Sequence, residues 1–238
     1  TTIEFFNINS QIKINMTGGN VKSGIYGGSN VTGIVYGSTE LNIKNGKVSS
    51  VYGGGEGQNT FVRDNIDVTI GTQEEGPNIS GNVYGGSAFG TVNATTTSES
   101  ANSKTVNVTV NNGNITGDVF GGAKGDASST PKVKGKITVN INGGTIANVY
   151  GGFDANGTPE NEDTVYLNGG IIGQAFGGGK NTSQTNTNIY LKGAQVDYIY
   201  GGSNQSGLVN LTNVYIESGN ANNAFGGNNL GGTCKKTN

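Results

Sequence analysis

The residues of this 238-residue chain that could bind a metal ion lie in one acidic segment, 154–163. Its oxygen-bearing side chains include Asp154, Asn156, Glu160, Glu162 and Asp163. Carboxylate and amide oxygens are the ligands that calcium prefers in proteins. The segment departs from the EF-hand loop, because it lacks the third Asp or Asn, the Gly at the sixth place and the flanking helices. Two interpretations therefore stay open, a calcium site and a solvated acidic loop.

Groups that could perform catalysis are scarce. The chain has no His, Cys234 is its single Cys and Arg63 is its single Arg. Without His there is no imidazole base and no His-containing zinc site, so catalysis would depend on carboxylates, Lys and Tyr. Asp and Glu do not recur at one position throughout the units of the repeat described below. We therefore predict no catalytic residue and a protein that is not an enzyme, with a polysaccharide lyase or hydrolase as the alternative.

Three tyrosines near the C-terminus could bind a ligand. Tyr166 lies between Val165 and Leu167, and Tyr190 and Tyr215 each lie between two aliphatic residues in the same way. Where the aliphatic residues of a strand point into a core, alternation sends the residue between them outward. Tyr166, Tyr190 and Tyr215 are therefore a candidate glycan platform or a contact for a neighbouring module. The alternative is that stacked outward Tyr side chains simply stabilise the sheet.

A second set of aromatic residues marks an internal repeat that organises the chain. An aliphatic residue or Ala, then an aromatic residue, then Gly-Gly recurs eight times, with the aromatics at Tyr26, Tyr52, Tyr84, Phe120, Tyr150, Phe176, Tyr200 and Phe225. Their spacings are 26, 32, 36, 30, 26, 24 and 25 residues, and Val35-Tyr36-Gly37-Ser38 is a ninth, degenerate copy. A period of this length is typical of repeat proteins such as solenoids.

Each copy of the motif follows a run of alternating aliphatic residues, such as Ile66-x-Val68-x-Ile70, and a Gly-containing turn, such as Asn112-Gly113. Period-two alternation of β-branched residues predicts half-buried strands, and Gly supplies the positive φ of the turns. Three short strands per unit predict an all-β fold, a single-stranded parallel β-helix of about eight to nine coils of roughly 25 residues. Hairpins of a β-sandwich would instead give spacings of roughly 8–12 residues.

In a parallel β-helix the eight motif aromatics would lie above one another as a ladder. Five are Tyr and three are Phe, so no hydroxyl group is required in every coil. We interpret the ladder as a structural row that fills a corner of the core, with a sugar-binding strip as the alternative. An ice-binding surface is disfavoured, because the outward positions mix Asn, Thr, Asp and Tyr instead of repeating Thr.

The charge balance and the short apolar runs argue against two classes of partner, nucleic acids and membranes. Charged residues make up 13% of the chain and the formal net charge is −2. This composition lacks the basic surface that nucleic-acid binding needs, so we expect no nucleic-acid partner. No apolar run approaches the roughly 20 residues that span a bilayer, so we expect no membrane insertion.

The aromatic-Gly-Gly repeat with its Asn-Gly and Gly-Gly turns resembles the parallel β-helix modules of large bacterial surface and secreted proteins, similar to adhesin passenger regions. The resemblance implies a right-handed helix, a location outside the cell or on the bacterial surface, and a role in adhesion or display. It also implies a host or cell-wall glycan, a protein ligand or neighbouring modules as partners. A phage or surface fibre segment is a further alternative. Because the chain starts without Met, we expect residues 1–238 to be one solenoid domain and a fragment of a longer protein.

Overall fold

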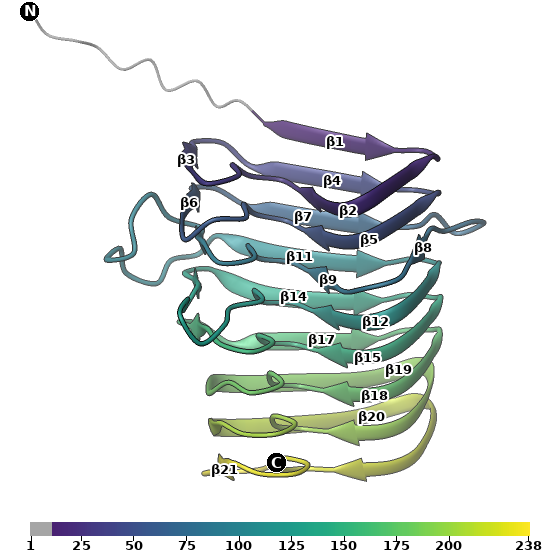
Figure 1. The fold of residues 1–238 in the computed structure, drawn as a ribbon. Helices are drawn as coiled ribbons and strands as arrows, with labels where there is room; N and C mark the ends of the chain where they lie inside the picture. The colour runs from purple at the N-terminus through teal and green to yellow at the C-terminus, as the bar shows by residue number, and fades with distance from the viewer. Residues whose placement is uncertain (1–10) are drawn as a thin grey trace, which may run out of the picture.

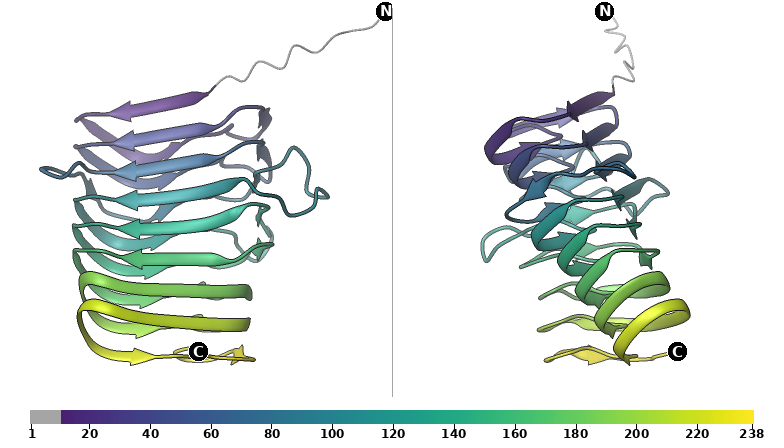
Figure 2. Two further views of the ribbon diagram at one scale, coloured as in Figure 1. Left: turned by 180° about the vertical axis from the view of Figure 1, so that it is seen from behind. Right: turned by 90° about the vertical axis from the view of Figure 1, so that its right-hand side faces the viewer.

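The computed structural model describes residues 11–238, and over this range the chain is all-β, with parallel strands stacked coil upon coil (Figure 1). The predicted β-solenoid is therefore confirmed. Residues 1–10 of the domain predicted for 1–238 lie outside the described residues. Figure 2 shows that the coils are stacked in sequence order from the N-terminal to the C-terminal end of the rod.

The first strand of every coil carries the alternating aliphatic run. These strands are β1 (Ile12–Met16), β4 (Thr39–Ile43), β7 (Ile66–Ile70), β11 (Thr105–Val110), β14 (Lys136–Ile141), β17 (Asp163–Leu167) and the first parts of β19 (Gln184–Tyr200) and β20 (Leu208–Phe225). Neighbouring strands pair in parallel with aliphatic residues in register, so that Val108 pairs with Val68 on one side and with Val139 on the other. These inward side chains are fully buried, which is the outcome that period-two alternation predicts.

The second strand of every coil carries the aromatic-Gly-Gly motif at its end. These strands are β2 (Asn20–Tyr26), β5 (Lys47–Tyr52), β8 (Asn78–Ile79) with β9 (Val83–Tyr84), β12 (Asn114–Phe120), β15 (Thr145–Tyr150), β18 (Ile171–Phe176) and the second parts of β19 and β20. Gly at the corner between the first and second strands takes a positive φ, for example 85° at Gly19 and 88° at Gly144. A residue without Cβ adopts that conformation at little cost, and this corner recurs in six of the eight coils, with Pro77 and Ala194 at the corresponding place in the other two.

A third, shorter strand completes the earlier coils, forming a five-stranded parallel sheet of β3 (Thr32–Val35), β6 (Asn59–Val62), β10 (Thr91–Val92), β13 (Lys132–Val133) and β16 (Thr158–Pro159). The last strand, β21 (Thr233–Cys234), pairs with the start of β20. Long insertions lie between the second strand of one coil and the first strand of the next, as in the segment that joins β10 to β11. Figure 1 shows this segment protruding from the side of the solenoid.

The buried residues divide into two clusters. The larger one is the aliphatic interior of the solenoid, contributed mainly by Val and Ile of the first two strands of each coil. The second cluster contains the motif aromatics from Tyr26 to Tyr200, without the exposed Phe225, together with Ala88 and Phe89, which belong to a loop that follows one Gly-Gly. The motif aromatics therefore lie outside the aliphatic interior and are covered by the loops instead.

The degenerate ninth copy does not add a coil. Val35 ends β3 in the third sheet, and Tyr36 is 54% exposed, with the Arg63 guanidinium 5.8 Å from its ring centroid. Within residues 11–238 the first strands number eight, so the solenoid has eight turns, the lower of the two predicted values. The copy at Tyr36 differs because its aromatic residue follows a strand of the short third sheet and meets no ring of a neighbouring coil.

Candidate functional site

The eight motif aromatics form one continuous stack along the solenoid. Consecutive ring centroids lie 4.6 to 5.1 Å apart, and the interplanar angles range from 2° to 11°. The six rings from Tyr52 to Tyr200 are buried, whereas the terminal Phe225 is 46% exposed. Because the ring faces are in contact with one another and the loops cover the row, the interior rings offer no free face to a sugar.

The hydroxyl ends of the stacked tyrosines meet a cluster of polar side chains from several coils. The Tyr84 hydroxyl donates to Asp154 Oδ2 at 2.8 Å, and Asn204 donates to the Tyr150 hydroxyl at 2.9 Å. Lys180 Nζ lies 3.2 Å from Asp118 Oδ2 and 4.0 Å from Asp154 Oδ1. Lys180 therefore joins two carboxylates that belong to different coils. We call Asp118, Asp154 and Lys180 the carboxylate–lysine cluster.

Burial sets the electrostatics of the carboxylate–lysine cluster. Removal from water raises the pKa of the Asp154 carboxyl, while the bond from Tyr84 and the charge of Lys180 act in the opposite direction. The same burial, together with the negative charge of Asp154, raises the pKa of Tyr84. The sequence did not point to this cluster, because Asp118 lies within β12 whereas Asp154 and Lys180 lie in loops after Gly-Gly. No single repeat position could have revealed it.

The structure does not bring the acidic residues of segment 154–163 together. Asp154 belongs to the carboxylate–lysine cluster, Glu160 pairs with Lys134, and Glu162 lies 3.3 Å from Lys136. The Asn156 amide donates to the Asp126 carbonyl and to Thr130, both at 3.0 Å. Among residues 11–238 no group of three or more Asp, Glu, His or Cys could hold a metal ion. Calcium binding here stays a prediction without geometric support.

Asp163, the last residue of that segment, points into the solenoid. Its side chain is fully buried, and neither carboxylate oxygen has a hydrogen-bond partner in the described part of the chain. Burial, with a smaller contribution from Glu162, raises the pKa of Asp163 well above its ordinary value. The residue therefore favours its neutral, protonated form in the folded protein, where a charge would be unpaired.

Threonines at the same place in other coils show which bond Asp163 replaces. Thr39, Thr187 and Thr212 each donate a hydroxyl hydrogen bond to the backbone carbonyl fourteen residues later, which belongs to the first Gly of Gly-Gly. Asp163 pairs in register with Thr187, and its corresponding carbonyl is that of Gly177. A protonated Asp163 has the same kind of O–H donor as these threonines.

The three tyrosines predicted to point outward form a second aromatic stack. Tyr166, Tyr190 and Tyr215 pair in register, and their ring centroids lie 5.0 and 4.4 Å apart. Tyr215 is 42% exposed, and Tyr166 and Tyr190 are half-buried. Because the rings are stacked, they present edges and hydroxyl groups to solvent instead of one flat row of faces.

Lys192 adds a positive charge to this open stack. Its Nζ lies 5.2 Å from the Tyr166 centroid and 5.3 Å from the Tyr190 centroid, within the range of cation–π contacts. The same ammonium is 3.6 Å from the Glu217 carboxylate. Beside the rings, Asn213 donates to Asn188 at 2.8 Å. The outward face therefore combines phenol groups, amides and an ion pair, which are the groups that commonly bind carbohydrate hydroxyls.

Comparisons with known proteins add no identification: no protein-family model, curated protein or solved structure matches the chain. No helix long and apolar enough to cross a membrane occurs among residues 11–238.

Proposed function

We propose that this chain is a non-enzymatic module of a bacterial surface or secreted protein that acts in adhesion or display and recognises carbohydrate. The solenoid supplies a stiff scaffold, because each coil is hydrogen-bonded to the coils above and below it. The open stack of Tyr166, Tyr190 and Tyr215 supplies the recognition surface. A host or cell-wall glycan is the proposed ligand, and neighbouring modules of a longer protein are proposed contacts.

One observation carries this proposal. In register with the three tyrosines, the earlier coils carry small polar residues, with Asn140 beside Tyr166 and Thr109 and Thr69 further along the same row. Those coils have the same buried interior without an aromatic residue at this place. The fold therefore does not require the tyrosines, and their exposed hydroxyl edges suit a role in binding.

A glycan array with three versions of the protein tests the proposal. The test variant carries Tyr166→Ala, Tyr190→Ala and Tyr215→Ala, and the matched control carries Thr69→Ala, Thr109→Ala and Asn140→Ala in the same row of earlier coils. We expect the array signal to fall at least tenfold in the tyrosine variant and to persist in the control. Unchanged binding by the tyrosine variant would reject this surface as the recognition site.

The carboxylate–lysine cluster favours a second candidate function, hydrolysis or elimination on a polysaccharide. Both reactions use acidic or basic side chains that face one substrate. Asp118 and Asp154 come from different coils and share Lys180, and burial raises the pKa of Asp154. Release of reducing ends or of unsaturated sugars from a polysaccharide panel, abolished by Asp154→Asn, would support this function. A protein without turnover on the panel would leave the binding role as the sole proposal.

A further inference from the structure

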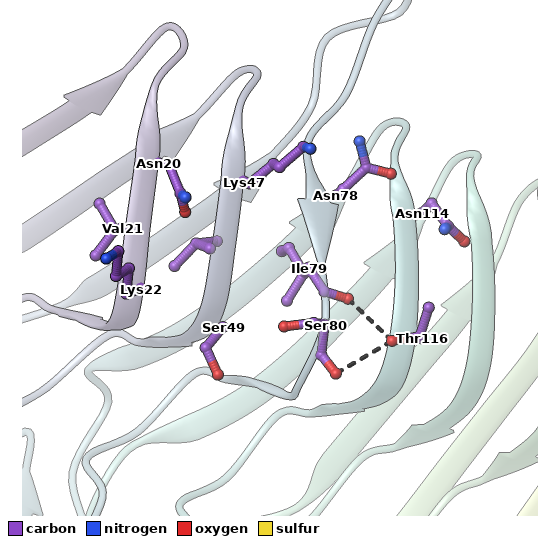
Figure 3. Close-up of a pocket in the computed structure, with 11 residues that line it drawn as sticks. Asn20, Val21, Lys22, Lys47, Ser49, Asn78, Ile79, Ser80, Asn114 and Thr116 are labelled. Atoms are coloured by element: carbon purple, nitrogen blue, oxygen red, sulfur yellow. Dashed lines mark hydrogen bonds between the residues drawn. The ribbon is translucent and has the colours of Figure 1, made fainter.

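Two hollows adjoin on the outer side of the second strands. The first has a volume of about 260 Å³ and is lined by β2, β5, β8 and β12, as Figure 3 shows. The second has a volume of about 570 Å³ and is lined by β15, β18, β19 and β20. Asn114 of the first hollow is paired in register with Thr145 of the second. The two hollows therefore lie on adjacent coils, and together their lining residues come from all eight coils.

We call this feature the trough and define it by two rows of side chains. One row consists of Asn20, Lys47, Asn78, Asn114, Thr145, Ile171, Gln195 and Asn220, and the other of Lys22, Ser49, Ser80, Thr116, Ala147, Gly173, Asp197 and Asn222. Between the rows runs the backbone of inward-pointing residues such as Ile79 and Ile172, whose side chains are buried in the solenoid interior. Eight coils at the spacing of paired strands give the trough a length of about 34 Å, with its long direction along the solenoid axis.

The amides in the first row differ from the other stacked amides of the molecule. Elsewhere on the surface, asparagines of adjacent coils bond to each other, as when Asn142 donates to Asn111 and Asn168 donates to Asn142, both at 2.9 Å. Asn78 and Asn114 are likewise in register, yet within the described residues their side chains make no hydrogen bond to protein. The same holds for Asn20, Gln195 and Asn220. These exposed amides keep their donors and acceptors available for a ligand.

The charges of the trough select among ligands. Its charged wall residues are Lys22 and Lys47 near the N-terminal end and Asp197 near the C-terminal end. The middle of the trough, from Asn78 to Gly173, carries uncharged side chains. An anionic polymer would leave most of its charges without a partner there, whereas an uncharged polymer of hydroxyl groups matches the free amides.

An extended peptide fits the trough less well. A peptide that adds to a sheet needs an unpaired strand edge for its backbone hydrogen bonds. The strands under the middle of the trough are paired on both sides by the neighbouring coils, as β12 is paired with β8 and β15, and of the strands that line the trough within residues 11–238 only β2 and the second part of β20 have a partner on one side alone. We propose that the trough binds a linear, uncharged polysaccharide whose chain runs parallel to the solenoid axis. The proposal rests on the proposed function only for the class of ligand, and its site is separate from the tyrosines.

Calorimetric titrations with neutral hexasaccharides test this site. The probes are cellohexaose, chitohexaose and xylohexaose, with hexagalacturonate as the charged counterpart. One trough variant carries Asn78→Ala and Asn114→Ala, and a second carries Ser80→Trp, which fills the first hollow from an exposed position. The tyrosine variant and the control with Thr69→Ala, Thr109→Ala and Asn140→Ala are titrated beside them. Far-UV circular dichroism and the midpoint of thermal unfolding establish that each variant is folded.

We expect at least one neutral hexasaccharide to bind and both trough variants to lose affinity at least tenfold, while the control variant binds as the unmodified protein does. Unchanged affinity in both trough variants would overturn the inference. If affinity fell only in the tyrosine variant, the trough would be rejected and the proposed function would stand. Binding of hexagalacturonate alone would overturn the assignment of an uncharged ligand, and binding of none of the four probes would count against both proposals.

Discussion

Two stacks of aromatic rings run along this solenoid, and they differ in what covers them. Ring centroids in the motif stack are 4.6 to 5.1 Å apart, and those in the open stack of Tyr166, Tyr190 and Tyr215 are 4.4 and 5.0 Å apart. The interior rings of the motif stack are buried under loops, whereas the open stack faces solvent. Both spacings follow from the distance between paired strands.

The comparison separates register from burial. Any aromatic residue kept at one place in successive coils will stack, so stacking alone says nothing about function. What distinguishes the two rows is the apolar area removed from water, which is large for the motif stack and small for the open stack. We therefore assign stability to the covered stack and ligand binding to the open one, and substitutions can test that division.

The largest effect is expected for Phe120→Ala in the middle of the motif stack. Phe120 is fully buried between Tyr84 and Tyr150, so the substitution leaves a cavity and removes two ring contacts. Loss of a buried Phe costs about 3–5 kcal/mol of unfolding free energy. Urea unfolding followed by circular dichroism measures the change. A loss below about 1 kcal/mol would show that the motif stack does not hold the coils together.

Asp163→Thr tests a buried polar residue of the interior. Because burial disfavours its charged form, Asp163 lowers the free energy of unfolding at neutral pH. Burial raises the pKa of Asp163 in the folded protein well above that of the unfolded chain, in which Asp ionises near pH 3.9. Stability therefore falls as the pH rises above about 4, until the pKa of the folded state is reached. Thr supplies a hydroxyl donor that does not ionise in this pH range. We therefore expect Asp163→Thr to raise the free energy of unfolding by about 1–3 kcal/mol at pH 7.

Urea unfolding at pH 4 and pH 7 measures this difference between Asp163→Thr and the unmodified protein. The gain should be smaller at pH 4, where Asp163 is still about half protonated in the unfolded chain, and larger at pH 7. Asp197→Thr, at an exposed position, is the control and should change stability little at either pH. An equal gain at both pH values would contradict the assignment of a neutral Asp163.

A smaller loss is expected for Tyr150→Phe, which keeps the stacked ring and removes its hydroxyl group. That hydroxyl accepts a hydrogen bond from the buried Asn204, so the amide would lose this partner. The expected cost is about 1 kcal/mol in urea unfolding. Phe176 is the next ring of the stack after Tyr150 and has no hydroxyl group. Phe176→Leu therefore measures the loss of a ring alone and is the comparison for Tyr150→Phe. A cost for Tyr150→Phe equal to that of Phe120→Ala would mean that polar bonds, not ring packing, dominate the motif stack.

The smallest effect on stability is expected for Tyr190→Ala in the open stack. Cross-strand pairs on an exposed face contribute about 0.2–1 kcal/mol, because solvent reaches both partners. Thermal unfolding of Tyr190→Ala beside Thr109→Ala measures the difference that the ring makes. A loss of the size expected for Phe120→Ala would assign the open stack to stability, and the proposed binding role would lose its support.

The architecture could be predicted from the sequence because the same strand and turn pattern recurs eight times. Parallel coils and Gly at most corners follow from alternation and from a spacing near 25 residues, whereas the predicted third strand forms only in the earlier coils. The alternation within the first strands also predicts the orientation of Asp163. It precedes Val165 and Leu167 by an even number of residues, so its side chain points inward with theirs. The calcium-site prediction placed Asp163 in a surface loop, although this alternation places its side chain in the interior.

Features that depend on contacts between non-equivalent positions were not predicted. Lys180 meets Asp118 and Asp154 only because two loops fold back over the ends of the motif tyrosines. The trough was missed for another reason. Its first row is built largely of ordinary Asn and Gln, and what distinguishes these amides within residues 11–238 is the absence of the bonds that other stacked amides make, which no pattern of residue types records.

The direction of the coil-to-coil hydrogen bonds has a mechanical consequence. Gly53 donates to Tyr84, Gly85 to Phe120 and Gly121 to Tyr150, each toward the next coil and thus along the length of the rod. A force that pulls the two ends apart would load the outermost coil first, and its bonds would open one after another, not all together. Under tension such a rod would unwind coil by coil from one end. Each coil that opens would add about 25 residues of extended chain.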